Sequence, residues 1–145
     1  MVFRKGFTLL EMTMAMMITV LAAMVVVPAW TNVMHEWDLE AQTRKMVAKI
    51  REVQQLAVAD QKLHLITFNS VQYTVADSSY VVIEGPVAYG NGITASASFM
   101  LPMTFTLGFD QFGSPVEGGD IILTDLSSNS FTIHVEPVTG RVHIP

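Results

Sequence analysis

Glu11 is a carboxylate inside a stretch, residues 7–27, that is otherwise almost wholly apolar and whose other polar side chains are threonines. About twenty helical residues, each rising about 1.5 Å, cross a hydrocarbon layer of about 30 Å, so this stretch predicts a membrane-spanning helix. A charged side chain within such a helix costs about 2.5–3.5 kcal/mol on insertion scales. We therefore expect Glu11 to have a function and to need a partner of opposite charge.

The charges on either side of this stretch predict its orientation. Arg4 and Lys5 precede it, and the acidic residues Glu36, Asp38 and Glu40 follow it. Cationic flanks stay on the cytoplasmic side, so we expect the N-terminus inside and the rest of the chain outside. An ordinary secretory signal, cut near residues 21–24, and a plain signal anchor are two alternatives. Neither of them explains Glu11.

The other reactive side chains predict no catalytic centre. The chain has no cysteine, which excludes a disulfide, a thiolate nucleophile and a cysteine-ligated zinc site. It also has no Gly-x-Ser-x-Gly elbow, phosphate-binding loop or dinucleotide fingerprint. We therefore expect no enzymatic activity, no cofactor and no small-molecule substrate.

Histidines and aspartates in the second half of the chain predict turns rather than metal sites. His134 and His143 flank the turn 137–140 and could meet across a hairpin, but a closed metal site needs three or four ligands. Asp110, Asp120 and Asp125 lie near glycine-rich turns without the alternating carboxylates of a calcium loop. We expect no bound metal.

A long helix must position Glu11. Residues 36–62 have a helical pattern, in which one apolar stripe runs among charged residues and consists of Val47, Ile50, Val53, Leu56 and Ala57. Joined to the apolar stretch, this segment makes one helix of about fifty residues. Pro28 falls at the end of the apolar stretch, where it either kinks the helix or simply marks its local end.

The rest of the chain predicts a β-rich head. After residue 62 the pattern changes to short β-branched and aromatic runs between turn residues such as Gly85-Pro86 and Gly118-Gly119-Asp120. Short connections favour antiparallel neighbours. The sequence predicts an α+β fold in which two small antiparallel sheets, or one strongly bent sheet, pack on the helix stripe. The expected strands are 63–69, 72–75, 80–84, 99–105, 107–112, 121–125, 131–135 and 141–144.

The start of the chain resembles the processing site of type IV prepilins. The residues that carry the resemblance are Gly6-Phe7-Thr8-Leu9-Leu10-Glu11-Met12. The resemblance implies that a prepilin peptidase cuts after Gly6 and methylates Phe7, which leaves Glu11 as the fifth residue of the mature chain. It further implies that the carboxylate of Glu11 pairs with the new terminal amine of a neighbouring subunit, so that both buried charges are compensated. Many pilins also resemble this chain in having a proline near position 28.

The C-terminal third is similar to the GspH/FimT-type minor pilins and pseudopilins. The similarity rests on Phe112-Gly113, on residues 119–123 and 131–135, and on the closing run Thr139-Gly140-Arg141-Val142. It implies a bent, β-sandwich-like head closed by a C-terminal hairpin. Some FimT-type pilins take up DNA through basic residues near the C-terminus, which makes Arg141 a possible nucleic-acid contact. A net charge of −5 and the isolation of Arg141 argue against DNA binding.

These observations predict four segments: a leader, 1–6; a membrane-spanning assembly helix, 7–28; the amphipathic second half of the helix, 29–62; and the head, 63–145. The prepilin resemblance implies a minor, initiating or tip subunit of a type IV pilus or a type II secretion pseudopilus. The implied partners are other pilin subunits, the prepilin peptidase, the inner-membrane assembly platform and lipid. The implied location is the inner membrane, crossed once, and then an extracytoplasmic filament.

Overall fold

The structure is a computed structural model that describes residues 8–90, 92–98 and 105–145. Its contacts divide the chain into two compact units, Met1–Met34 and His35–Pro145. One helix, α1 (Leu9–Asp60), contributes residues to both units. The expected single long helix is therefore present.

Local hydrogen bonds explain where α1 begins and ends. Thr8 caps its N-terminus, because the Thr8 hydroxyl accepts a hydrogen bond from the backbone N–H of Glu11 at 3.2 Å. At the other end Gln61 adopts a left-handed conformation with φ of 52°, and the N–H of Lys62 donates to the carbonyl of Ala57 at 3.2 Å. This six-to-one hydrogen bond is that of a Schellman motif, which satisfies a carbonyl that the helix leaves free.

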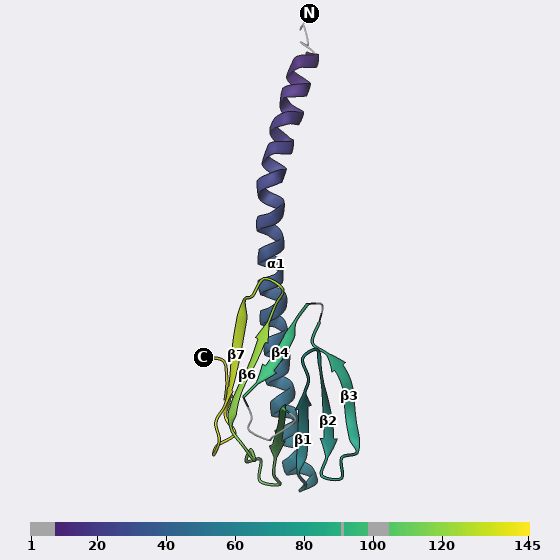
Figure 1. Cartoon of the computed structure of the whole chain (residues 1–145), viewed down its shortest axis with the longest axis vertical. Helices are drawn as coiled ribbons and strands as arrows, with labels where there is room; N and C mark the ends of the chain where they lie inside the picture. The colour runs from purple at the N-terminus through teal and green to yellow at the C-terminus, as the bar shows by residue number, and fades with distance from the viewer. Residues whose placement is uncertain (1–7, 91, 99–104) are drawn as a thin grey trace, which may run out of the picture. The chain divides into compact units, whose positions relative to one another are not determined.

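The strands among the described residues of the second unit, eight in all, form two antiparallel sheets. Figure 1 shows their arrangement. The first sheet has the order β3-β2-β1-β5, and the second has the order β4-β6-β7-β8. Every pairing within them is antiparallel, as the short connections predict. The strands are β1 (His64–Phe68), β2 (Gln72–Asp77), β3 (Val82–Ala88), β4 (Thr94–Ala97), β5 (Phe105–Phe109), β6 (Gly119–Thr124), β7 (Ser130–Val135) and β8 (Val142–His143).

The hydrophobic core lies between the second half of α1 and the two sheets. The predicted helix stripe is buried at Val47, Ile50, Val53 and Ala57, whereas Leu56 is only partly buried. In β1 the buried positions alternate along the strand, so one face of the sheet meets the helix and the other stays more exposed. The strands contribute the buried side chains Ile66, Phe68, Val75, Leu107, Phe109, Ile121, Leu123, Ile133 and Val135 to the same cluster.

Polar contacts fix α1 to both sheets. Lys49 bridges Glu52 on the helix at 2.7 Å and Glu84 on β3 at 2.9 Å. The Arg51 guanidinium donates to the carbonyl of Val142 on β8 at 2.9 Å. The Lys49–Glu84 and Arg51–Val142 contacts start on the helix and end on different sheets, so the helix and the sheets hold one another in register.

The strand predictions are mostly right, but several boundaries are wrong. Gly85-Pro86 lies inside β3 rather than in a turn, and Tyr80 precedes that strand. Gly119 and Asp120 belong to β6, whereas residues 110–112 form a turn rather than the end of a strand. β4 was not predicted at all. Most of the expected strand 99–105 falls outside the described residues.

Candidate functional site: the apolar half of α1

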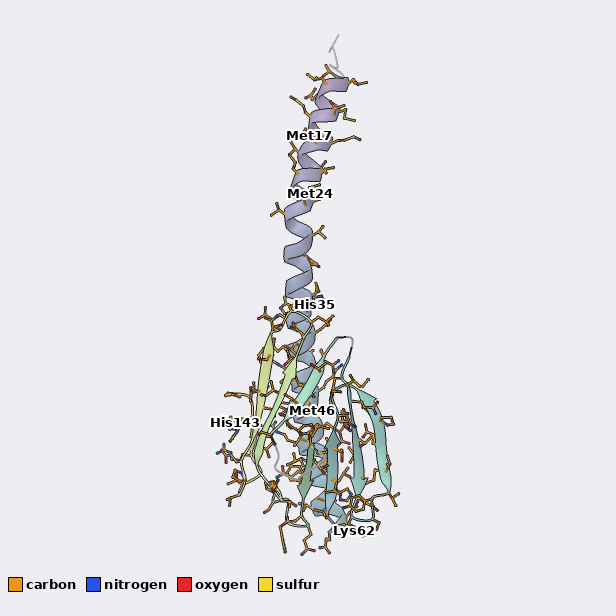
Figure 2. The ribbon with its side chains drawn as sticks, in the orientation of Figure 1. Met17, Met24, His35, Met46, Lys62 and His143 are labelled. Atoms are coloured by element: carbon orange, nitrogen blue, oxygen red, sulfur yellow. The ribbon has the colours of Figure 1, made fainter. Side chains whose placement is uncertain are left out.

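The described part of the first unit is an isolated apolar helix surface. Residues 9–27 of α1 have a mean hydropathy of 2.2 over 19 residues, long and apolar enough to cross a membrane by length and composition. Every described side chain from position 8 to position 27 is exposed. Figure 2 shows Met17 and Met24 projecting from this helix, with 67% and 69% of their surfaces accessible. Such a surface is stable in lipid or against other apolar helices, but not in water.

The threonines of this segment satisfy their own hydrogen-bonding groups. The Thr13 hydroxyl donates to the carbonyl of Leu10 at 2.8 Å. The Thr19 hydroxyl lies 2.8 Å from the carbonyl of Met16 and 3.0 Å from that of Ala15. These bonds remove most of the cost of placing hydroxyls in an apolar medium. Both residues are therefore compatible with a membrane span.

Glu11 differs from the threonines because its carboxylate is unsatisfied. Among the residues that the structure describes, no hydrogen bond or ion pair reaches its side-chain oxygens. Glu11 also lies in the first turn of α1, where the exposed N–H groups of the helix favour a negative charge by about 0.3–1 kcal/mol. That contribution is smaller than the cost of burying a carboxylate in hydrocarbon, so Glu11 still lacks a full counter-charge.

The N-terminal cap of α1 was not predicted from the sequence. Thr8 and Glu11 are spaced as the first and last residues of a capping box, Ser/Thr-x-x-Glu, whose presence before an apolar run predicts a helix start. Of the other predicted residues in this region, Gly6 and Phe7 lie outside the described part of the chain. α1 continues through Pro28, so the proline does not end the helix, and the described contacts do not test the alternative of a kink.

A second group of predicted residues meets at the C-terminal hairpin. His134 on β7 and His143 on β8 are paired across the hairpin, with ring centroids 5.3 Å apart. His134 Nδ1 also lies 2.5 Å from a carboxylate oxygen of Asp120 on β6. The described residues contain no group of three histidine or acidic side chains placed to hold a metal ion. The two histidines thus meet as expected, in a hairpin contact.

Asp110 and Asp125 have the predicted turn-forming role, which Asp77 shares. Each carboxylate accepts hydrogen bonds from the backbone N–H groups two and four residues later, at distances of 2.8–3.0 Å. Asp125 is only 8% exposed and also accepts from the side-chain amide of Asn129 at 3.0 Å. Burial raises the pKa of Asp125, but the bonds from Asn129 and Ser127 outweigh it, so the pKa lies below its usual range.

No family model matches the chain, and no curated protein matches it in sequence. Solved structures do match it in fold. The type IV minor pilin FimU of Pseudomonas aeruginosa PAO1 superposes with a TM-score of 0.61 at 11% identity, covering 76% of this chain and 90% of FimU. The minor pseudopilin EpsH of the Vibrio cholerae type 2 secretion system gives 0.60 at 6% identity, covering 74% of this chain and 96% of EpsH. The chain therefore has the α+β fold of these minor pilins and pseudopilins.

Proposed function

We propose that this chain is a non-enzymatic structural subunit of a type IV pilus or a type II secretion pseudopilus. One observation carries the proposal: a head with the pilin-like fold is joined to an exposed apolar helix of 19 residues, whose one carboxylate, that of Glu11, has no ion-pair partner among the described residues. The similarity of the head to FimU and EpsH supports a minor subunit, one that initiates or tips the filament.

The chemistry of the apolar helix supports assembly through this segment. Before assembly, lipid tails cover its side chains; within a filament, the helices of other subunits would cover them instead. Lipid tails are as apolar as these side chains, so the hydrophobic effect contributes little to the transfer from membrane to filament. Close packing and polar interactions must therefore favour the filament over the membrane. In this segment Glu11 is the residue able to form a strong polar interaction.

The proposed counter-charge is the amine of a neighbouring subunit. Removal of residues 1–6 by a prepilin peptidase would leave N-methyl-Phe7 at the start of the mature chain. Its cationic amine and the Glu11 carboxylate would each be costly alone in an apolar medium, whereas together they compensate each other. Because the pair requires a fixed offset between two helices, it would also set the axial register of assembly.

The same proposal places the chain in the inner membrane before assembly. Its N-terminus would be cytoplasmic, beside Arg4 and Lys5, and its head would be extracytoplasmic. The inner-membrane assembly platform would then draw the helix from lipid into the filament. The peptidase and the platform are the partners that this proposal implies, and residues 1–6 are the leader that the peptidase would remove.

Shearing and fractionation of native cells test the proposed function. The chain should occur in the membrane fraction and in sheared filaments, and cells without the prepilin peptidase should retain it wholly in the membrane. A chain that is found only as a free, non-sedimenting protein outside the membrane would contradict the proposal. An inner-membrane protein unrelated to the filament serves as the control for contamination of the sheared fraction.

A further inference from the structure

A basic groove lies in the head where α1 meets the C-terminal strand. Two adjoining hollows, of about 440 and 510 Å3, share Arg51 and His143 in their walls. Arg44 lines the first hollow and Arg141 lines the second. Three of the four arginines of the chain thus gather at one place, although Arg141 is ninety residues from Arg51 in sequence.

The fold positions each cation of this groove. Arg44, Ala48 and Arg51 share one face of α1, because steps of four and three residues return to the same side of a helix. The bond from Arg51 to the Val142 carbonyl holds β8 against that face. Figure 2 shows His143, which belongs to β8, on the outer side of the head. The groove is therefore a built feature of the helix–strand contact.

Not all of the positive charge in the groove is used within the chain. Arg44 pairs with Glu40 at 2.7 Å, yet its side chain is 74% exposed. The Arg141 guanidinium makes no hydrogen bond to any of the described residues. Next to it, the pKa of Glu136 is held below its usual range, first by a hydrogen bond from Thr139 and also by the charges of Arg141 and the nearby histidines. The charge of Arg141 thus acts on Glu136, although no hydrogen bond joins the two side chains among the described contacts.

The net charge of the groove indicates which kind of anion it can bind. Arg44, Arg51 and Arg141 contribute three positive charges, and Glu40 and Glu136 offset two of them. The second unit as a whole carries six Lys and Arg against twelve Asp and Glu, a net charge of −6. A nucleic-acid backbone needs several unopposed cations and would be repelled at long range. One or two carboxylates beside apolar neighbours suit the groove better, because Val47, Ala48 and Ile144 also line it.

We propose that this groove binds a carboxylate side chain of a neighbouring filament subunit, an inference that rests on the proposed function. Arginine is suited to the role because its planar guanidinium can bind both oxygens of a carboxylate at once. Acidic pilin-like heads offer such groups: in this chain Glu36 and Asp38 are exposed, and neither makes an ion pair with another described residue. The contact would select neighbours by charge and fix the rotation of the head, rather than supply most of the binding free energy.

Photo-crosslinking in native filaments tests the groove. The chain has no cysteine, so Ala48→Cys provides a unique attachment point for a maleimide–benzophenone probe inside the groove. Ala88→Cys, an exposed alanine on β3, is the matched control away from it. We expect the probe at position 48 to form adducts with an acidic peptide of another filament subunit, identified by mass spectrometry.

The arginines should control this adduct. Arg141→Glu should lower the yield at position 48 by about tenfold, because it replaces an attraction by a repulsion, and should leave the yield at position 88 unchanged. Arg141→Lys should retain part of the yield, because it keeps the charge but loses the contact with both oxygens. Arg141→Gln should lower the yield further, and it serves as the test if the glutamate variant fails to fold. Exchange of the identified partner carboxylate for lysine should restore the adduct of Arg141→Glu.

Three outcomes would overturn the inference. Adducts that are insensitive to both Arg141→Glu and Arg141→Gln would show that charge in the groove does not select the neighbour. Adducts with nucleic acid would show that the groove binds a phosphate backbone instead of a carboxylate. If filaments contain the chain but position 48 yields no adduct, the groove inference fails alone; if the chain never enters filaments, the proposed function fails with it.

Discussion

Glu11 has a different electrostatic setting in each state of the chain. In the isolated subunit it lies in the first turn of α1, where helix N–H groups partly balance its charge. In the proposed filament the amine of Phe7 on a neighbour replaces that weak balance by an ion pair. Glu11 therefore needs no partner within its own chain, and the described residues give it none.

Removal of the Glu11 carboxylate should impair assembly into filaments without impairing removal of the leader. Glu11→Ala should leave removal of residues 1–6 largely intact but lower the amount of chain in sheared filaments by about tenfold, the equivalent of about 1.4 kcal/mol. Immunoblots of membrane and sheared fractions measure it. Thr13→Ala is the matched control, because the Thr13 hydroxyl bonds only to its own helix. Normal assembly of Glu11→Ala would contradict the pairing of charges.

Asp125 gives the head an acid-sensitive turn. Its pKa is lowered in the folded state, so its charged form contributes stability that is complete well above the unfolded value of about 3.9. That contribution is lost as the pH falls through the folded pKa. The melting temperature of the full chain in detergent should therefore fall below about pH 4, and it should fall less steeply for Asp125→Asn. Equal slopes for both proteins, measured by circular dichroism, would show that Asp125 is not linked to folding.

At the scale of elements, α1 has two surfaces with different partners. Its second half buries one stripe under the sheets, whereas its first half presents apolar side chains on every side. An apolar stripe is typical of a helix in a globular head, and an all-round apolar surface is typical of a membrane span. The helix therefore belongs to two environments along its length.

A pair of valines on α1 tests the packing of its second half. Val53 is fully buried, whereas Val58 is 48% exposed, so the same substitution removes core contacts only at position 53. Val53→Ala should lower the free energy of unfolding by about 2 kcal/mol. Val58→Ala should change it by less than about 0.5 kcal/mol, since alanine's higher helix propensity offsets the small loss of contact. Chemical denaturation in detergent measures both, and equal losses would contradict the burial of the stripe.

The C-terminal cap of α1 offers a stabilising change. Gln61 has a φ of 52°, a conformation that costs a residue with a Cβ about 1 kcal/mol and costs glycine almost nothing. Gln61→Gly should therefore raise the free energy of unfolding by about 0.5 kcal/mol, after the added flexibility of the unfolded chain is deducted. Gln55→Gly, an exposed site within the same helix, should instead lower it by about 1 kcal/mol. A loss of stability in Gln61→Gly would indicate that the Schellman cap is absent.

The sequence predicts the elements well where their patterns are strong. The stripe of α1 and the β-branched strands could be recognised from periodicity alone. The predicted strand 80–84 ends too early, because Gly85 and Pro86 usually mark turns. An edge strand such as β3 nevertheless tolerates proline, since the missing N–H can face away from the sheet. β4 consists of Thr94-Ala95-Ser96-Ala97, in which only Thr94 has a side chain that favours strands, so its pairing with β6 was not recognisable from the sequence.

The two candidate sites also differ in whether the sequence alone predicts them. Glu11 could be found from sequence because a carboxylate within an apolar run stands out over a few residues. The basic groove could not, because Arg44 and Arg51 meet Arg141 only after β8 packs on the helix. Local patterns reveal sites made of neighbouring residues, whereas sites made by tertiary contact need the folded chain.

At the scale of the whole molecule, assembly into a filament requires that the apolar segment remains in the mature chain. A pilin subunit keeps residues 9–27 after the leader is removed, whereas a chain with an ordinary secretory signal loses them. The head fold is compatible with both outcomes, because the second unit has its own core between the second half of α1 and the sheets. The mature N-terminus therefore discriminates between a filament subunit and a free exported domain.

Intact-mass measurement of the chain recovered from sheared native filaments is the most direct test. We expect one mature species that begins at Phe7 and carries a single added methyl group on its terminal amine. A mature chain that begins beyond Ala23 would lack both Glu11 and most of the apolar helix, and it would contradict assembly through this segment.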